Sequence, residues 1–193
     1  MATDPHEVRL TGENSFITLS AEKGGEPTTK ASHWRVLVSP AGMGHVLYLK
    51  SELTDGNPRI YADNIALARW LQEGIFGSLS QDYTNLNLPI SEAEFSRVGD
   101  ITTYWTENVE SESDSVALTW HDFGTPFVFK FAPGDRPNQS HGVYTVMIPA
   151  VKAQLTVNGQ VAAGQPFPTD QDGRKGSTAS LALSETWVKP QND

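Results

Sequence analysis

The 193-residue sequence contains no cysteine. Disulfide bonds, thiolate zinc sites, iron–sulfur clusters and cysteine nucleophiles are therefore excluded. Basic residues are also few, because 14 Lys and Arg stand against 23 Asp and Glu, which gives a formal net charge of −9. A protein that binds nucleic acid through phosphate contacts needs clustered cations, so no nucleic-acid partner is expected. The expected partner is a small molecule.

Long apolar runs are missing as well. No stretch reaches the roughly 18 apolar residues of a membrane-spanning helix, so no membrane partner is expected. The start of the chain, MATDPHEVRL, lacks the basic and apolar regions of a secretory signal, and we expect a cytoplasmic protein. With 38% hydrophobic residues the chain is suited to one hydrophobic core and not to intrinsic disorder. A homodimer is left open.

Most of the sequence alternates apolar and polar residues with a period of two, with turn residues about every eight to twelve positions. This pattern predicts an all-β, mainly antiparallel fold of about nine or ten strands, either a barrel or a two-sheet sandwich. The plan resembles lipocalin-like proteins at the level of fold alone. Residues 1–30 are polar and predict an N-terminal arm with one short strand around 16–19. Residues 31–193 are expected to form a single β domain.

Two segments predict short helices. Asp63 is suited to an N-cap, and apolar residues recur after it at helical spacing as far as Ile75. A second short helix is predicted from Ser91, because Ser91 and Glu94 have the spacing of a capping box.

The strand predicted over 101–110 places a carboxyl group on its apolar face. Glu107 shares the odd-numbered face with Trp105. A four-residue turn at 111–114 pairs Trp105 with Trp120, so the apolar faces of the two strands coincide. Glu107 is therefore expected to point into the core.

The last predicted strand, 178–188, repeats this arrangement. Alternation places Glu185 between Leu183 and Trp187 on the apparent core face. A buried carboxylate costs several kcal/mol unless it is paired or protonated. Burial also raises the pKa of a carboxyl group toward neutrality and makes it a usable general acid or base. The alternative for both glutamates is a place at the barrel rim or a pair with an arginine, such as Arg35, Arg59 or Arg97.

The histidines add weaker evidence. His33 and His45 flank one hairpin, and they share a face if its turn has three or five residues but not if it has four. No two histidines have a recognisable metal-ligand spacing, so neither a metal nor a cofactor is expected. His121 lies opposite Tyr104 in the predicted register, and His141 closes a long loop of the kind that forms the rim of a binding site.

These observations predict an enzyme that binds an apolar or aromatic metabolite inside the β structure. Its expected reaction is cofactor-independent acid/base chemistry, such as elimination, hydration or isomerisation. The residues expected to carry the acid/base work are Glu107, Glu185, Tyr104, His121 and His141. Those expected to bind substrate are Trp34, Trp105, Trp120, Trp187, Phe129 and Tyr144.

The alternative is a non-catalytic ligand-binding or carbohydrate-binding β module that uses the same aromatic residues. Two carboxyl groups that converge on one cavity favour the enzyme. Separate, arginine-paired glutamates favour the binding module.

Overall fold

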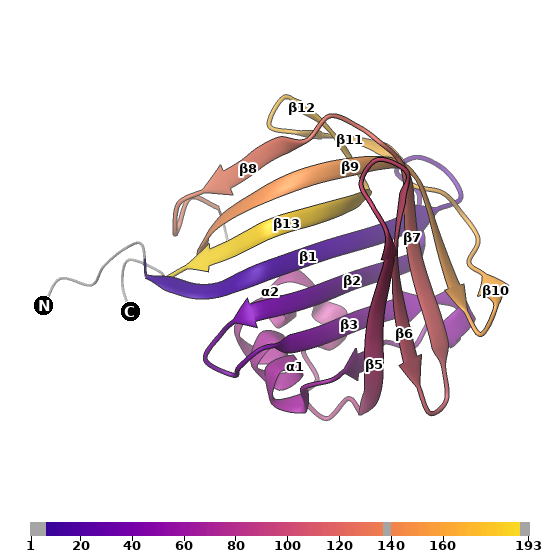
Figure 1. The fold of residues 1–193 in the computed structure, drawn as a ribbon, viewed down its shortest axis with the longest axis horizontal. Helices are drawn as coiled ribbons and strands as arrows, with labels where there is room; N and C mark the ends of the chain where they lie inside the picture. The colour runs from indigo at the N-terminus through magenta and orange to yellow at the C-terminus, as the bar shows by residue number, and fades with distance from the viewer. Residues whose placement is uncertain (1–6, 137–139, 190–193) are drawn as a thin grey trace, which may run out of the picture.

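A nine-stranded β-barrel forms the body of the computed structural model, which describes residues 7–136 and 140–189. Its strands are β1 (Val8–Ser20), β2 (Pro27–Val38), β3 (Gly44–Ser51), β4 (Arg59–Ala62), β5 (Ile90–Gly99), β6 (Tyr104–Ser111), β7 (Ser115–Phe123), β9 (Gly142–Val157) and β13 (Ala179–Val188). They follow the order β9-β13-β1-β2-β3-β4-β5-β6-β7, and the pairing of β7 with β9 closes the ring (Figure 1). The predicted all-β class is confirmed, and the architecture is a barrel.

Four shorter strands lie outside the ring. β8 (Phe127–Phe131) pairs with the first half of β9, and β10 (Gln160–Val161) pairs with its end. β11 (Pro168–Gln171) and β12 (Arg174–Ser177) form a separate hairpin close to β8 and β9 (Figure 1). All pairings in the ring are antiparallel except that of β4 with β5, which is parallel and needs a crossover connection.

The crossover connection holds the helical part of the protein. It contains α1 (Ile65–Leu71), a π-helical turn η2 (Gln72–Phe76), α2 (Gly77–Leu79) and a 3-10 turn η3 (Gln81–Tyr83). Another 3-10 turn, η1 (Glu52–Thr54), follows β3. The predicted helix is present, but its N-cap is Asn64 and not Asp63, because the Asn64 side chain accepts a hydrogen bond from the Leu67 N–H. No helix in the described ranges is long and apolar enough to cross a membrane.

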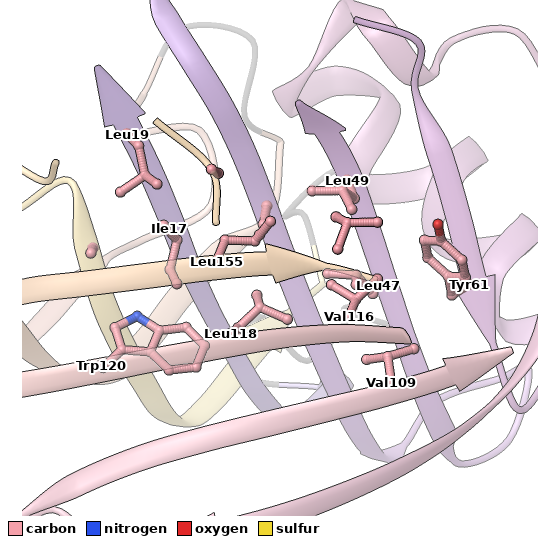
Figure 2. Close-up of a cluster of buried hydrophobic side chains, with 14 of the residues drawn as sticks. Ile17, Leu19, Leu47, Leu49, Tyr61, Val109, Val116, Leu118, Trp120 and Leu155 are labelled. Carbon is pink, nitrogen blue, oxygen red and sulfur yellow. The ribbon is translucent and has the colours of Figure 1, made fainter. Parts of the chain in front are cut away.

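One hydrophobic cluster lies in the interior of the barrel. Figure 2 shows its larger side chains pointing toward one another from strands on all sides of the ring. The fully or nearly fully buried members include Ile17, Leu19, Leu47, Leu49, Tyr61, Val109, Val116, Leu118, Trp120 and Leu155. This part of the interior is packed with side chains and is not a ligand cavity.

A second cluster lies on the outside of the barrel wall. The helical segment covers the outer face of β2, β3 and β4, where Leu67 and Leu71 pack on Trp34 and Tyr48. Trp187 of β13 belongs to the same outer cluster, and its ring centroid lies 6.2 Å from that of Trp34. The protein therefore has two apolar layers separated by one sheet.

The predicted register of the β6–β7 hairpin is confirmed. Trp105 pairs with Trp120, Glu107 with Leu118, and the turn joins Glu110 to Ser115. Glu107 is 3% exposed and points into the barrel, as the alternation predicted.

Two local predictions are wrong. The segment from Ser91 is not a helix but strand β5, because Ile90 pairs in parallel with Ile60 and the chain then continues as the antiparallel partner of β6. Residues 7–30 do not form an arm with a short strand at 16–19, and the rest of the predicted arm, residues 1–6, lies outside the described residues. Within the described residues, β1 runs from Val8 to Ser20 and is paired on both sides, with β13 and with β2.

Candidate functional site

A β-bulge in β13 decides where Glu185 points. The pairing of β13 with β9 shifts between Leu183 and Thr186, and Ser184 has a φ of 52°. The extra residue turns Glu185 and Trp187 to the outer face of the sheet, while Leu183 stays against the interior cluster. The prediction that Glu185 shares the core face with Leu183 is therefore wrong, although Glu185 is buried, at 4% exposure.

Glu185 lines a cavity of about 200 Å³ on the outer face of the barrel. A neighbouring cavity of about 260 Å³ shares the lining residues Asn14, Phe16 and Leu79. We call these two adjoining cavities the outer groove. Its Glu185 end is lined by Asn14, Phe16, Leu79, Phe129, Phe131, Val143, Thr145, Met147, Gln171, Ala182, Glu185 and Trp187. The wall is mostly apolar with a few polar groups, which is typical of a small-molecule site.

The environment of Glu185 favours its neutral form. The pKa of this carboxyl group is raised from 4.5 to about 7, mainly because the group is buried. Hydrogen bonds with Trp187, Thr145 and Asn14 act in the opposite direction and lower the pKa, but by less. The Trp187 indole N–H donates to Oε1 at 2.7 Å. The Ser32 hydroxyl donates to the Asn14 amide oxygen at 2.8 Å. The Asn14 amide nitrogen is therefore the group that donates to the Glu185 carboxyl group. Within the described part of the chain, no Lys or Arg forms an ion pair with Glu185.

Two further polar atoms at the outer groove lack a hydrogen-bond partner among the described residues. They are the amide oxygen Oε1 of Gln171, at the Glu185 end, and the hydroxyl of Tyr83, at the other end. Buried polar atoms in folded proteins almost always have a partner, so each such atom calls for an explanation. A bound molecule with polar groups supplies one.

Glu107 has a different environment from Glu185. Its Oε1 accepts hydrogen bonds from Arg97 Nε at 2.6 Å and from Trp105 Nε1 at 2.8 Å. Arg97 lies over the Trp105 ring, 4.3 Å from its centroid, and also bonds Glu13. Burial raises the pKa of Glu107, while the Arg97 charge and both hydrogen bonds lower it. Glu107 is thus an arginine-paired carboxylate inside the barrel, and it does not share a cavity with Glu185.

His33 and His45 share a face of their hairpin, because β2 and β3 pair Arg35 with His45 and leave a five-residue connection. Their rings stack with centroids 5.9 Å apart. Burial is the main cause that lowers the pKa of His33 to about 3, so His33 is neutral. His45 Nδ1 lies 2.6 Å from Asp63 Oδ2, and the His45 backbone N–H donates to the other carboxylate oxygen. Asp63 thus orients His45 rather than capping α1.

The remaining predicted site residues are spread over the surface and both layers. Tyr104 and His121 are cross-strand neighbours with ring centroids 6.2 Å apart, and neither lines the outer groove. Tyr144 is 45% exposed on the face of β9 opposite to Thr145. The ring of His141 lies 6.0 Å from that of Trp187, at the edge of the Glu185 end. Of the predicted substrate-binding residues, only Trp187 and Phe129 line the same cavity as Glu185, since Trp105 and Trp120 face the interior and Trp34 lies beneath the helical segment.

Several residues of the outer groove were not predicted. Asn14 and Thr145 look like ordinary polar positions of alternating strands, and they reach Glu185 only through the bulge. Gln171 had a usable signal, because Asp172-Gly173 after it is the turn of the β11–β12 hairpin, with positive φ at both residues.

Comparison of the chain with protein-family models gives no match, and comparison with curated proteins and with solved structures gives no significant match either. Among the described residues, no three His, Asp or Glu side chains are grouped as metal ligands. We therefore infer the function from the geometry around Glu185.

Proposed function

We propose that the protein is an enzyme that binds a small, largely apolar or aromatic molecule in the outer groove and transfers a proton with Glu185. The reaction class is cofactor-independent acid/base chemistry, namely elimination, hydration or isomerisation. One observation carries this proposal: Glu185 is a buried carboxyl group that forms no ion pair with a Lys or Arg among the described residues, and it lines a mostly apolar cavity. Structural carboxylates are normally paired, whereas catalytic acids and bases are tuned by burial of this kind.

The raised pKa of Glu185 allows it both to accept and to donate a proton. A pKa of about 7 keeps the acid and the carboxylate populated near neutral pH. The carboxylate then removes a proton from carbon, and the acid returns it to a neighbouring atom or to a leaving group. Trp187 and Asn14 orient the carboxyl group through their hydrogen bonds and are positioning residues.

The polar atoms without partners indicate the polarity of the substrate. The Oε1 atom of Gln171 is an acceptor, so it favours a ligand with an O–H or N–H group. The rings of Phe129 and Phe131 lie against each other, with centroids 5.7 Å apart, and form an apolar wall beside that group. A small aromatic or alicyclic molecule with one hydroxyl or amide group fits this set of contacts.

A generic probe of carbon-proton abstraction tests the proposal. Nitrobenzisoxazole is a small aromatic molecule that loses a carbon-bound proton to a base, breaks its N–O bond and forms a coloured cyanophenolate. We expect the wild-type protein to accelerate this elimination over an equal concentration of acetate, with a rate that rises with pH to a plateau above about pH 7. Glu185→Gln should abolish the acceleration, and the exposed Glu94→Gln should keep it.

The outcomes separate the two classes of function. Equal rates for wild-type protein, Glu185→Gln and acetate would refute the acid/base role. If the probe nevertheless quenches tryptophan fluorescence in both proteins, the groove is the site of a non-catalytic binding module. A rate lost in Glu107→Gln but retained in Glu185→Gln would place the chemistry in the barrel interior and overturn the proposal.

A further inference from the structure

A separate, larger cavity lies beside the β11–β12 hairpin. It has a volume of about 820 Å³ and is enclosed by the β7–β8 connection, the middle of β9, the segment before β11, and β12. No residue lines both this cavity and the Glu185 end of the outer groove. We call it the hairpin cavity. Its volume lies within the range of about 300–1,000 Å³ that holds small-molecule ligands.

The wall of the hairpin cavity is mainly apolar and poor in hydrogen-bond donors. Its apolar residues are Pro126, Phe127, Pro149, Ala150, Val151, Pro166, Phe167 and Pro168. Proline has no backbone N–H, so the proline-lined parts of the wall offer no backbone donor to a ligand. Val151 is 66% exposed and lies at this cavity, where an apolar ligand would cover it. Binding of an apolar group here removes hydrocarbon from contact with water, which favours binding.

The charge of the hairpin cavity is opposite to that of the protein. Its charged lining residues are Arg174 and Lys175, and its lining includes no carboxylate. The chain as a whole carries a formal net charge of −9. By contrast, the cavities beside Glu185, Asp63 and Asp82 each include a carboxylate in the wall. The cations at the hairpin cavity are therefore selective for an anionic group.

No ion pair within the described part of the chain neutralises either cation. Arg174 donates to the backbone oxygen of Val128 and lies 5.8 Å from the centroid of the Phe127 ring, which fixes the guanidinium at the cavity. Asp170 is the cross-strand neighbour of Lys175 and accepts the Gly173 N–H, and no ion pair joins it to Lys175. Among the described residues, no carboxylate lies within ion-pair distance of Arg174 or Lys175.

We propose that the hairpin cavity binds an amphipathic carboxylate, with an apolar chain or ring against the prolines and phenylalanines and the carboxylate at Arg174 and Lys175. A guanidinium pairs with a carboxylate through parallel hydrogen bonds, and the adjacent ammonium adds a second charge. This site is independent of the proton-transfer site at Glu185.

Decanoate is a suitable probe, with decanol as its uncharged counterpart. We expect titration of the full-length protein, followed by backbone amide NMR shifts, to place decanoate at β12 and at the middle of β9. Arg174→Gln/Lys175→Gln should weaken decanoate binding by about tenfold or more and leave decanol binding unchanged. Added salt should weaken decanoate binding but not decanol binding.

Matched variants make the test specific. Lys23→Gln/Lys130→Gln removes the same charge from exposed positions away from the cavity wall and should keep decanoate binding. Val151→Asp, at an exposed position, should weaken decanoate binding because it places a carboxylate beside the cavity. Glu185→Gln should bind decanoate as the wild type does. The inference is overturned if decanoate does not bind, if it shifts residues of the outer groove instead, or if the Arg174/Lys175 variant binds it as tightly as the wild type.

Discussion

The stability of the Glu185→Gln variant should depend on pH in a direction that the structure dictates. Glu185 is buried, the described residues supply no Lys or Arg ion pair to it, and its pKa is raised from 4.5 to about 7. At about 1.4 kcal/mol per pH unit, this rise corresponds to about 3 kcal/mol. Between these two pH values the folded chain holds a proton that the unfolded chain has released. The unfolding free energy therefore falls as pH rises. Above about pH 7 the wild-type protein has lost the full amount of about 3 kcal/mol.

Because glutamine cannot ionise, the unfolding free energy of the variant does not fall through ionisation at this position as pH rises. Its side-chain oxygen can still accept the Trp187 indole N–H, which keeps the local geometry. We expect similar urea-unfolding free energies for the two proteins at about pH 5, and a variant more stable by up to about 3 kcal/mol at about pH 8. Any loss of the Asn14 contact affects both pH values equally and cancels in the difference.

Two control variants test whether the pH dependence comes from the burial of Glu185. Glu107→Gln should show a smaller pH-dependent difference, because the Arg97 charge opposes the effect of burial there. Glu94→Gln, on the exposed face of β5, should match the wild type at both pH values. A Glu185→Gln difference that is the same at pH 5 and pH 8 would refute the claim of an uncompensated buried carboxyl group.

Two further substitutions test the fold. Trp120→Ala should cost about 3–5 kcal/mol in urea unfolding, because this side chain is fully buried in the interior cluster. A cost below about 1 kcal/mol would contradict the assigned faces. Asp114→Ala should cost about 2–4 kcal/mol, because it removes the acceptor of both Arg59 and the Tyr61 hydroxyl. Lys152→Ala, which breaks the exposed pair with Asp122, should have little effect, and equal losses in the two variants would contradict the burial of Asp114.

The sequence predicted those parts of the fold in which alternation and turn length agree. The β6–β7 hairpin is the clearest case, because both the pattern and the four-residue turn place Trp105 opposite Trp120. The segment from Ser91 failed because a capping-box spacing also occurs in a strand, and the parallel pairing with β4 is a long-range contact without a local signature. Because of that error the pairing of Arg97 with Glu107 could not be predicted, since it is strand β5 that places Arg97 directly opposite Glu107.

The candidate site could be predicted only in part, for a similar reason. Glu185 was found from its place in an apolar strand, but its direction depends on one residue, Ser184, in a left-handed conformation that serine seldom adopts. A shift of one residue moves every following side chain to the other face of a sheet. The outer groove, with Asn14, Thr145 and Gln171, follows from that bulge and could not be assembled without it.

The two glutamates show which part of their environment matters for chemistry. Each accepts an indole N–H from the tryptophan two residues away along its strand, Glu107 at 2.8 Å and Glu185 at 2.7 Å. The hydrogen bond from a tryptophan therefore does not distinguish them. The Arg97 charge does, because it opposes the rise in the pKa of Glu107 inside the barrel, whereas no Lys or Arg of the described ranges does so at Glu185 on the outside. Introducing an arginine beside Glu185 should consequently lower its pKa and stop proton transfer at neutral pH, even if the groove still binds its ligand.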